Sequence, residues 1–180
     1  INNDSDKVTI KNGCKLYGNQ SKVGGGACFI SQGSLEILNE NVSTYGSNEF
    51  YGNSAGNNGG AISVNNGNLL FSEGIVGKSD SPNVATANGG GINVNNGTVT
   101  VNGGTISYNQ ALSTNHTYGG GGGLNVEQGT TNFNGGVISR GVYGGGAGIA
   151  PDAARTRRYR AVRRFPAGDA GPHDGQRGRH

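Results

Sequence analysis

The chain has 180 residues, of which 37 are Gly and 24 are Asn, with neither Met nor Trp and only 32% hydrophobic side chains. Because Gly costs a helix interior about 1 kcal/mol relative to Ala, this composition excludes a helical bundle, and the lack of Met indicates a fragment or processed piece of a longer chain. The net charge of +3 comes from residues 151–180, because residues 1–150 carry six basic and eight acidic side chains, so the body of the chain lacks the charge of a nucleic-acid-binding protein.

Four similar segments repeat along the chain at intervals of about 32 residues. Each begins with Gly-Gly or Gly-Ala, continues as a short alternation of apolar and polar residues, and ends at a turn that contains Gly. The segments span residues 26–33, 60–67, 90–97 and 122–129. Their inward residues are expected at Cys28/Ile30, Ile62/Val64, Ile92/Val94 and Leu124/Val126. Alternation of this kind predicts a strand with one buried face.

A second alternating run follows each turn, and a third short run follows the second. The inward positions of the second run are Val8/Ile10, Leu35/Ile37, Leu69/Phe71, Val99/Val101 and Thr131/Phe133. The third run is centred on Leu16, Phe50, Ile75, Ile106 and Ile138. Each repeat therefore holds three predicted strands, and polar loops such as residues 79–88 and 110–118 lead to the next repeat.

Equivalent strands 30 to 34 residues apart are expected to lie side by side, so that each repeat forms one triangular coil about 4.8 Å above the last. The sequence thus predicts an all-β fold within residues 1–150, a parallel β-solenoid of about four to five coils of roughly 32 residues. One coil alone would bury five or six apolar side chains at roughly 1.5–3 kcal/mol each. Ordering about thirty residues costs about 1–2 kcal/mol each, so only stacked coils are expected to be stable.

Two kinds of corner residue are predicted from the repeat. The glycines that follow each first strand are expected to adopt positive φ, and they are Gly33, Gly67, Gly97 and Gly129. Three asparagines fall at equivalent places after the third strand, namely Asn19, Asn53 and Asn109. Their stacked amides are expected to form a ladder that Lys78 and Gly141 interrupt.

The predicted outward positions do not bring acidic side chains together. Those of the second run are Glu36, Leu70, Thr100 and Asn132, and those of the first are Phe29, Ser63, Asn93 and Asn125. Neither column pairs two carboxylates for acid–base chemistry or supplies the oxygen ligands of a Ca²⁺ site. We therefore predict no catalytic residue, no metal site and no cofactor.

Single residues with reactive side chains are each better explained without a function. Gly77-Lys78-Ser79 resembles the end of a phosphate-binding loop, but Ser72 stands where that loop needs Gly. His116 has no partner ligand nearby and is expected to be a solvated loop residue. Cys28 occupies an inward position and is expected to be a small core residue, whereas Cys14 is not placed, and the two could pair if they meet at a corner.

The composition changes at about residue 147. Residues 151–180 lack Asn, Ser, Lys, Ile and Leu, yet they hold eight Arg and three of the four Pro. Two explanations remain open. The segment is either a genuine basic appendage, or a sequence that is out of frame or crosses a gene junction. The second is favoured, because a fifth repeat begins at Val142 and then stops. This tail is expected to be disordered and to attract phosphate without a specific nucleic-acid partner.

Two stretches resemble known repeats. Residues 103–111, followed by Tyr118-Gly-Gly-Gly, resemble the G-G-T-I-S-x-N-x-A…Y-G-G-G repeats of bacterial surface proteins with right-handed parallel β-helix, pectin-lyase-like domains. Residues 50–55, leading to residues 59–62, are similar to the F-x-x-N and G-G-A-I pair of the polymorphic outer-membrane protein repeats of chlamydial autotransporters, although F-x-x-N is intact only once. The resemblance covers roughly residues 8–149.

The resemblance implies an exported module located outside the cell or at the cell surface. We expect a non-catalytic, adhesin-like β-helix repeat module, not an enzyme, with an unknown host or cell-surface ligand for which a glycan is one candidate, and with no transmembrane segment. The alternative is a pectin-lyase-like polysaccharide lyase or hydrolase, since such enzymes share the scaffold. That chemistry would need charged side chains clustered on one face, and only Glu36, Glu73, Lys78 and Arg140 are available.

Overall fold

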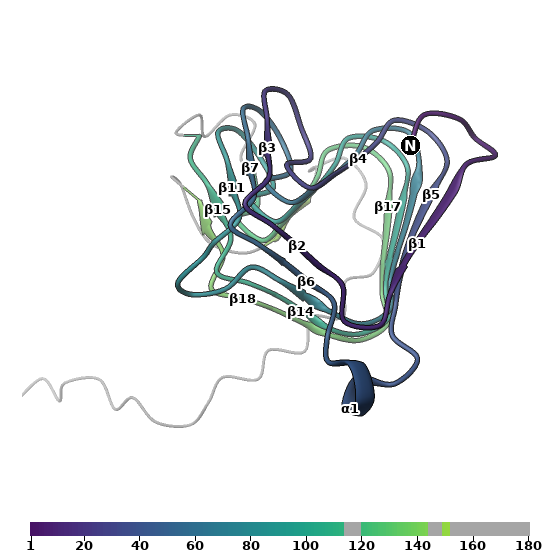
Figure 1. Ribbon diagram of the computed structural model, residues 1–180. Helices are drawn as coiled ribbons and strands as arrows, with labels where there is room; N and C mark the ends of the chain where they lie inside the picture. Colours follow the sequence, from purple (N-terminus) through teal and green to yellow (C-terminus); the bar gives the residue numbers. More distant parts are fainter. Residues whose placement is uncertain (114–119, 144–148, 152–180) are drawn as a thin grey trace, which may run out of the picture.

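The chain winds into a parallel β-solenoid, as predicted. The structure is a computed structural model that describes residues 1–113, 120–143 and 149–151. Its strands form four sheets, each with five parallel strands, and each coil of the chain contributes one strand to every sheet. Figure 1 shows the coils stacked behind one another, with equivalent strands side by side.

The four sheets, here named A to D in the order in which the chain visits them, have these bounds. Sheet A contains β1 (Lys7–Lys11), β5 (Ser34–Leu38), β9 (Asn68–Phe71), β13 (Thr98–Val101) and β17 (Thr130–Phe133). Sheet B contains β2 (Lys15–Tyr17), β6 (Glu49–Tyr51), β10 (Ile75–Val76), β14 (Thr105–Ser107) and β18 (Val137–Ser139). Sheet C contains β3 (Gln20–Ser21), β7 (Ser54–Ala55), β11 (Val84–Ala85), β15 (Gln110–Ala111) and β19 (Val142–Tyr143). Sheet D contains β4 (Cys28–Ile30), β8 (Ile62–Val64), β12 (Ile92–Val94), β16 (Leu124–Val126) and β20 (Ile149–Pro151).

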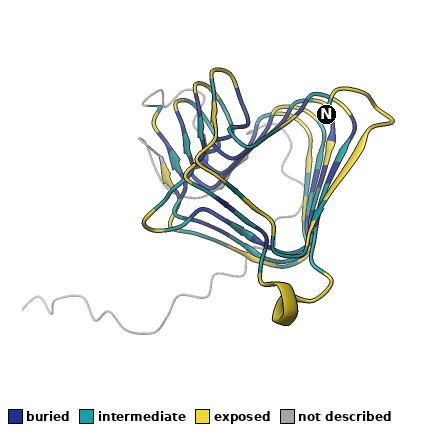
Figure 2. Ribbon diagram, in the orientation of Figure 1, coloured by how far each residue is buried: buried dark blue, intermediate teal, exposed yellow. Residues whose placement is uncertain are grey.

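The core lies inside the coils and is built from the predicted inward columns. In sheet A, Leu69 pairs with Leu35 on one side and with Val99 on the other, and all three side chains are buried. In sheet D, Ile62 pairs with Ile92 in the same way. Figure 2 shows the buried positions recurring at the same places in successive coils. The alternation and repeat period therefore predicted the register of both sheets.

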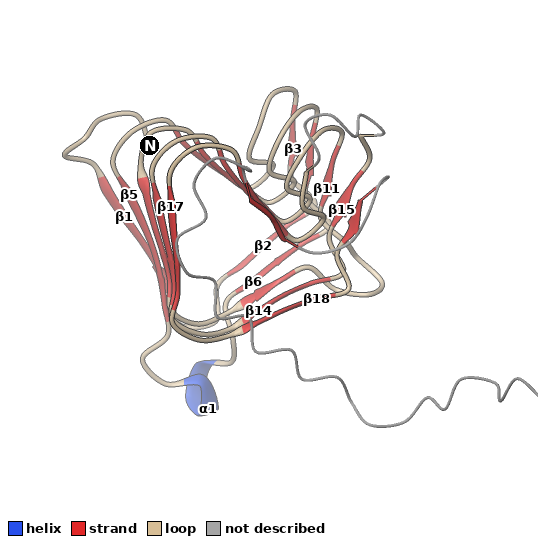
Figure 3. Cartoon of the chain, turned by 180° about the vertical axis from the view of Figure 1, so that it is seen from behind, coloured by secondary structure: helices blue, strands red, loops and turns tan. Residues whose placement is uncertain are grey.

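The prediction of three strands per coil was wrong, because a fourth short strand follows the third. It forms sheet C, and its members in the third and fourth coils, β11 and β15, lie in segments that we expected to be loops (Figure 3). Each sheet C strand has only two residues, and its buried residue is Ala in β7, β11 and β15. Two polar or small residues produce no detectable alternation, so the pattern could not distinguish this strand from a loop.

The third run was assigned correctly except in the third coil. There the inward residue is Val76, which pairs with Phe50 and Ile106, and not Ile75. Val76 is fully buried, whereas Ile75 is half-buried on the outer face of sheet B. Ile75 and Val76 are both β-branched and apolar, so the hydrophobic pattern allows either of them to face the core. Register with the neighbouring coils determines that Val76 does.

Sheet D departs from the expectation of one buried face per strand. The outward residues Ser63, Asn93 and Asn125 are in the predicted register but are buried. The glycine-rich corner before each sheet D strand folds over this outer face, and the backbone of Gly59 and Gly89 lies against Ser63 and Asn93. Buried amides need partners, and Asn125 Nδ2 donates to Asn93 Oδ1 at 2.8 Å.

The same corners explain why each repeat begins with Gly. In four successive coils the first Gly of the repeat lies where a Cβ would overlap the sheet C backbone of the next coil; these residues are Gly26, Gly60, Gly90 and Gly122. Of the glycines predicted to need positive φ, Gly33, Gly97 and Gly129 have it. Gly67 does not, and it is required instead because a side chain would meet Gly33 O and the Ile30 side chain.

The amide ladder is more complete than predicted. Asn83, and not Lys78, occupies the third coil's place in the column, because a longer loop precedes it. The ladder therefore runs through Asn19, Asn53, Asn83 and Asn109, with amide–amide distances of 2.9 Å at each step. Gly141 follows Asn109 in register, as expected, and ends the column.

The fifth coil extends further than the sequence indicated. Strand β20 pairs with β16, so the coil that we expected to stop soon after Val142 reaches sheet D. Residues 152–180, which hold the predicted disordered tail and its arginines, lie outside the described residues.

One inward position carries a defect that can be repaired. Thr131 pairs with the inward Val99, and its Oγ1 is buried without a hydrogen-bond partner among the described residues. Thr131→Val should raise the free energy of unfolding by about 1 kcal/mol, because an unsatisfied hydroxyl is replaced by a methyl group of the same shape. Urea unfolding followed by circular dichroism measures this change. Thr130→Val, at an exposed neighbouring position, is the control, and an equal gain there would contradict the assignment.

Candidate functional site

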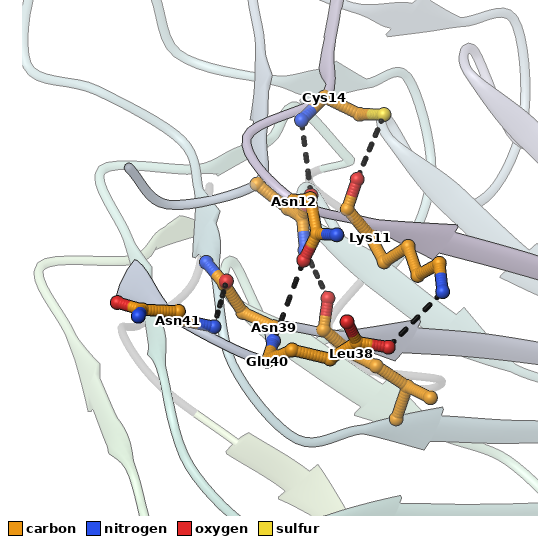
Figure 4. A network of polar contacts seen from close by, with 8 residues as sticks. Lys11, Asn12, Cys14, Leu38, Asn39, Glu40 and Asn41 are labelled. Atoms are coloured by element: carbon orange, nitrogen blue, oxygen red, sulfur yellow. Dashed lines mark hydrogen bonds and ion pairs between the residues drawn. The ribbon is translucent and has the colours of Figure 1, made fainter. Parts of the chain in front are cut away.

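A polar network joins the first two coils at the corner between sheets A and B (Figure 4). The second coil makes a long excursion here that contains the short helix α1 (Val42–Tyr45), capped by the Asn41 side chain. Lys11 Nζ contacts Glu40 Oε1 at 3.0 Å, and Cys14 N donates to the buried Asn48 Oδ1. These contacts join the excursion to the first coil, so the network anchors it. Among the described residues, no helix is long and apolar enough to span a membrane.

Acidic side chains on the strand faces pair with lysines of neighbouring coils. Glu36 Oε1 lies 2.8 Å from Lys7 Nζ on the outer face of sheet A. Glu49 Oε2, on the outer face of sheet B, lies 2.9 Å from Lys78 Nζ and 3.6 Å from Lys15 Nζ. Within the described residues, no group of three His, Cys, Asp or Glu side chains is placed to hold a metal ion.

The cluster around Glu49 keeps its charges over a wide pH range. Burial alone would raise the pKa of Glu49, but the hydrogen bond and charge of Lys78, helped by Lys15, outweigh it and lower this pKa below its ordinary value. The hydrogen bond to Glu49 in turn raises the pKa of Lys78. Lys78 therefore belongs to a surface ion cluster. A phosphate-binding loop would require a helix after Ser79, and no helix follows this residue in the described part of the chain.

Aromatic side chains line the same outer face of sheet B. Tyr17 and Tyr51 are adjacent in register, and their rings stack with centroids 5.1 Å apart and planes within 4° of each other. Lys78 Nζ lies 4.1 Å from the centroid of the Tyr51 ring, which is cation–π geometry. Further along the face, Arg140 lies over the Tyr108 ring at 5.2 Å and donates to its hydroxyl at 2.6 Å.

A shallow hollow separates these two groups of side chains. We call it the B-face hollow; its volume is about 420 Å³, and it is lined by Ile75, Gly77, Lys78, Ser79, Asp80, Thr105, Ser107 and Tyr108. Gly77 in its lining stands one residue beyond the Val76–Phe50 pair, at the register position that Tyr51 occupies in the coil before. Gly77 has a φ of 93°, and a Cβ there would overlap Ser107 O, so this position in the column stays empty.

Sequence reasoning missed most of this face. Tyr17, Tyr51, Tyr108 and Glu49 were not singled out, although Tyr17 and Tyr51 each follow the centre of the third run by one residue, a regularity visible in the repeat. Tyr108 and Arg140 both have positive φ, an unusual conformation for residues other than Gly and Asn, and it places them at the corner where β14 and β18 end. No composition signal predicts that conformation.

The two cysteines are both free and have different environments. Cys28 packs against the core, as predicted, and burial raises its pKa from 9.0 to about 11, partly offset by the charged N-terminus. Cys14 is exposed at the corner between sheets A and B. The disulfide that we left open as an alternative is therefore not formed.

This difference predicts selective modification. The rise in the pKa of Cys28 from 9.0 to about 11 lowers its thiolate fraction at pH 8 about a hundredfold. Cys28 is also only partly exposed, whereas Cys14 is exposed. Cys14 should therefore react with a thiol reagent at least tenfold faster than Cys28. Mass spectrometry of the folded chain after brief alkylation measures this order. Both thiols should react at similar rates in denaturant, and preferential labelling of Cys28 in the folded chain would contradict the prediction.

Other predicted candidates remain separate from the face of sheet B. Thr100 pairs with Leu70 and Asn132 on sheet A, so the predicted column of mixed residues is confirmed. His116 lies outside the described residues.

Comparison of the chain with protein-family models, with curated proteins and with solved structures gives no match.

Proposed function

We propose that this chain is a non-catalytic β-helix repeat module, exposed outside the cell or at the cell surface, that presents its sheet faces to a host or cell-surface ligand in the manner of an adhesin. The finer likeness to pectin-lyase-like and outer-membrane repeat domains belongs to this proposal, because it rests on the G-G-T-I-S and F-x-x-N motifs alone. The observation that carries the proposal is the pairing of surface acids with lysines.

Enzymes that cleave glycosidic bonds use two carboxyl groups about 5–9.5 Å apart, one of which must keep a proton. Here Glu36 lies between Thr9 and Leu70 in register, and its carboxylate pairs with Lys7. Glu49 lies beside Lys15 and Ile75, and the lysines that contact it lower its pKa. Both carboxylates are thus engaged by lysines in ion pairs, and the lowered pKa of Glu49 favours its ionised form, which supports a binding scaffold over acid–base catalysis.

The test is a paired screen of the full chain for cleavage and for binding. Neutral and acidic polysaccharides are incubated with the chain, and new reducing ends and the ultraviolet absorbance of unsaturated products are measured. Binding to immobilised glycans is measured in parallel in high salt, because the arginines of residues 151–180 would otherwise attract anionic sugars. We expect binding without products. Any turnover above that of a heat-unfolded control would overturn the proposal in favour of a lyase or hydrolase.

A further inference from the structure

The B-face hollow combines three properties. It has an aromatic wall at Tyr108, a hydroxyl-bearing floor at Thr105 and Ser107, and an apolar patch at Ile75. It is an open, shallow depression with a volume of about 420 Å³. A ligand for this hollow must therefore offer both an apolar surface and several hydroxyl groups.

The floor of the hollow carries two hydroxyl groups, one on the partly exposed Thr105 and one on Ser107, which is only 5% exposed. Within the part of the chain that the structure describes, neither the Thr105 hydroxyl nor the Ser107 hydroxyl has a hydrogen-bond partner. Thr105 faces outward beside Ile75 in register, and Ser107 lies two residues further along β14, on the same side of the strand. Neighbouring apolar and hydroxyl-bearing side chains of the floor are thus separated either by one strand spacing or by two residues along a strand, and both distances are a few ångströms.

The charges at the hollow indicate what kind of sugar it accepts. Lys78 is neutralised by Glu49 at 2.9 Å, and the rim also carries the carboxylate of Asp80. Asp80 lies near enough to contribute to the raised pKa of Lys78. With Lys78 paired to Glu49, the Asp80 carboxylate is the remaining charge of the lining residues, so an acidic ligand would meet repulsion there.

We propose that the B-face hollow binds one residue of a neutral glycan, with the apolar face of the pyranose ring against Tyr108 and Ile75 and its hydroxyl groups hydrogen-bonded to Thr105, Ser107 and Asp80. Pyranose rings have an apolar C–H face and a hydroxyl edge, which matches the two halves of the floor. Arg140 holds the Tyr108 ring in place from the next coil, so it acts as a positioning residue. This site rests on the proposed binding function and gives it a location and a ligand class.

The hollow is also preformed, which lowers the entropic cost of binding. Its floor is built from strands β10 and β14 in the interior of a five-stranded sheet, and no side chain has to leave it, because Gly77 has none. Preorganised sites lose less conformational freedom on binding than mobile ones. A single sugar residue in so shallow a site is still expected to bind weakly, with a Kd of about 1 mM, and a longer chain would gain affinity from neighbouring contacts.

The experiment measures binding of three neutral tetrasaccharides, cellotetraose, β-1,4-galactotetraose and chitotetraose, and of the acidic tetragalacturonate, to the full chain in high salt by saturation-transfer NMR and calorimetry. Two variants disrupt the hollow in different ways. Tyr108→Asn removes the ring with a residue that tolerates positive φ, and Thr105→Tyr fills the hollow from an outward strand position. Tyr45→Asn, at an exposed tyrosine on α1, is the matched control.

We expect at least one neutral tetrasaccharide to bind, and both hollow variants to weaken its binding at least tenfold while Tyr45→Asn leaves it unchanged. Circular dichroism of each variant must match the parent chain, and if Tyr108→Asn unfolds, Thr105→Tyr alone decides. Unchanged binding by a folded Thr105→Tyr variant would overturn the site but leave the binding module intact. Failure of all three sugars to bind, or tighter binding of tetragalacturonate, would overturn the assignment to a neutral glycan, whereas cleavage of any sugar would overturn the proposed function itself.

Discussion

Gly90→Ala should lower the free energy of unfolding by more than about 4 kcal/mol, and the variant is expected to be largely unfolded at room temperature. A Cβ at this position would overlap the backbone N, C and O atoms of Gln110 in the next coil. Backbone atoms of a paired strand cannot move aside as the end of a flexible side chain can, and Gly90 lies in the third of five coils, so strain spreads in both directions. Denaturant unfolding followed by circular dichroism near the β-sheet minimum measures the loss.

The control for this prediction is Gly46→Ala, at the end of α1. Gly46 has a φ of 74°, and a Cβ there would meet nothing within 4 Å. Its replacement should therefore cost only the strain of a left-handed conformation, about 1–2 kcal/mol. Gly90 does not have a positive φ, so its replacement tests close approach alone, and a loss no larger than that of Gly46→Ala would contradict the close approach of the third and fourth coils as the reason for Gly at position 90.

Asn83→Ala should destabilise the chain by about 3–5 kcal/mol, the second largest effect that we expect. Asn83 is fully buried, and its Oδ1 accepts from both the backbone N and the Nδ2 of Asn53, at 3.0 and 2.9 Å. Its Nδ2 donates to Phe50 O and to Asn109 Oδ1. Removing the amide leaves several buried groups without partners at once, and no water has access to replace it.

An exposed amide pair provides the comparison for Asn83. Asn96 Nδ2 donates to Asn66 Oδ1 at 2.9 Å, the same bond between neighbouring coils, but both side chains are exposed. Asn96→Ala should change stability by less than about 0.5 kcal/mol, because water satisfies the group that is left. If the two alanine variants unfold at the same denaturant concentration, burial does not determine the contribution of the amide ladder, and the prediction is wrong.

The repeat made the path of the chain predictable, because every strand has its partner one repeat away. Ile30, Val64 and Val94 were aligned from the sequence and pair as expected. Alternation then assigned the inward residues of sheets A and D without reference to any distant contact. Where the repeat changes length the prediction failed, as in the third coil, where an inserted loop moved the amide position from Lys78 to Asn83.

The face of sheet B was harder to predict for a physical reason. Gly77 in the lining of its hollow has no side chain, and Tyr108 and Arg140 have positive φ; neither feature has a signature in the hydrophobic pattern. The burial of Asn93 on the outer face of sheet D is similar, since it depends on a glycine corner that folds over the strand. The pattern of residue types does not show where two backbones approach each other closely.

The stacking of coils also has a consequence for how the chain folds. Each strand pairs only with its equivalents one coil before and one coil after it, so the sequence separation between partners stays between 25 and 34 residues along the solenoid. Once two coils have docked, every further coil closes a loop of the same size onto an existing template, at nearly constant entropic cost. Folding is therefore expected to start at whichever coil pair forms first and to spread outward in equal steps, so that lengthening the solenoid adds stability without slowing nucleation.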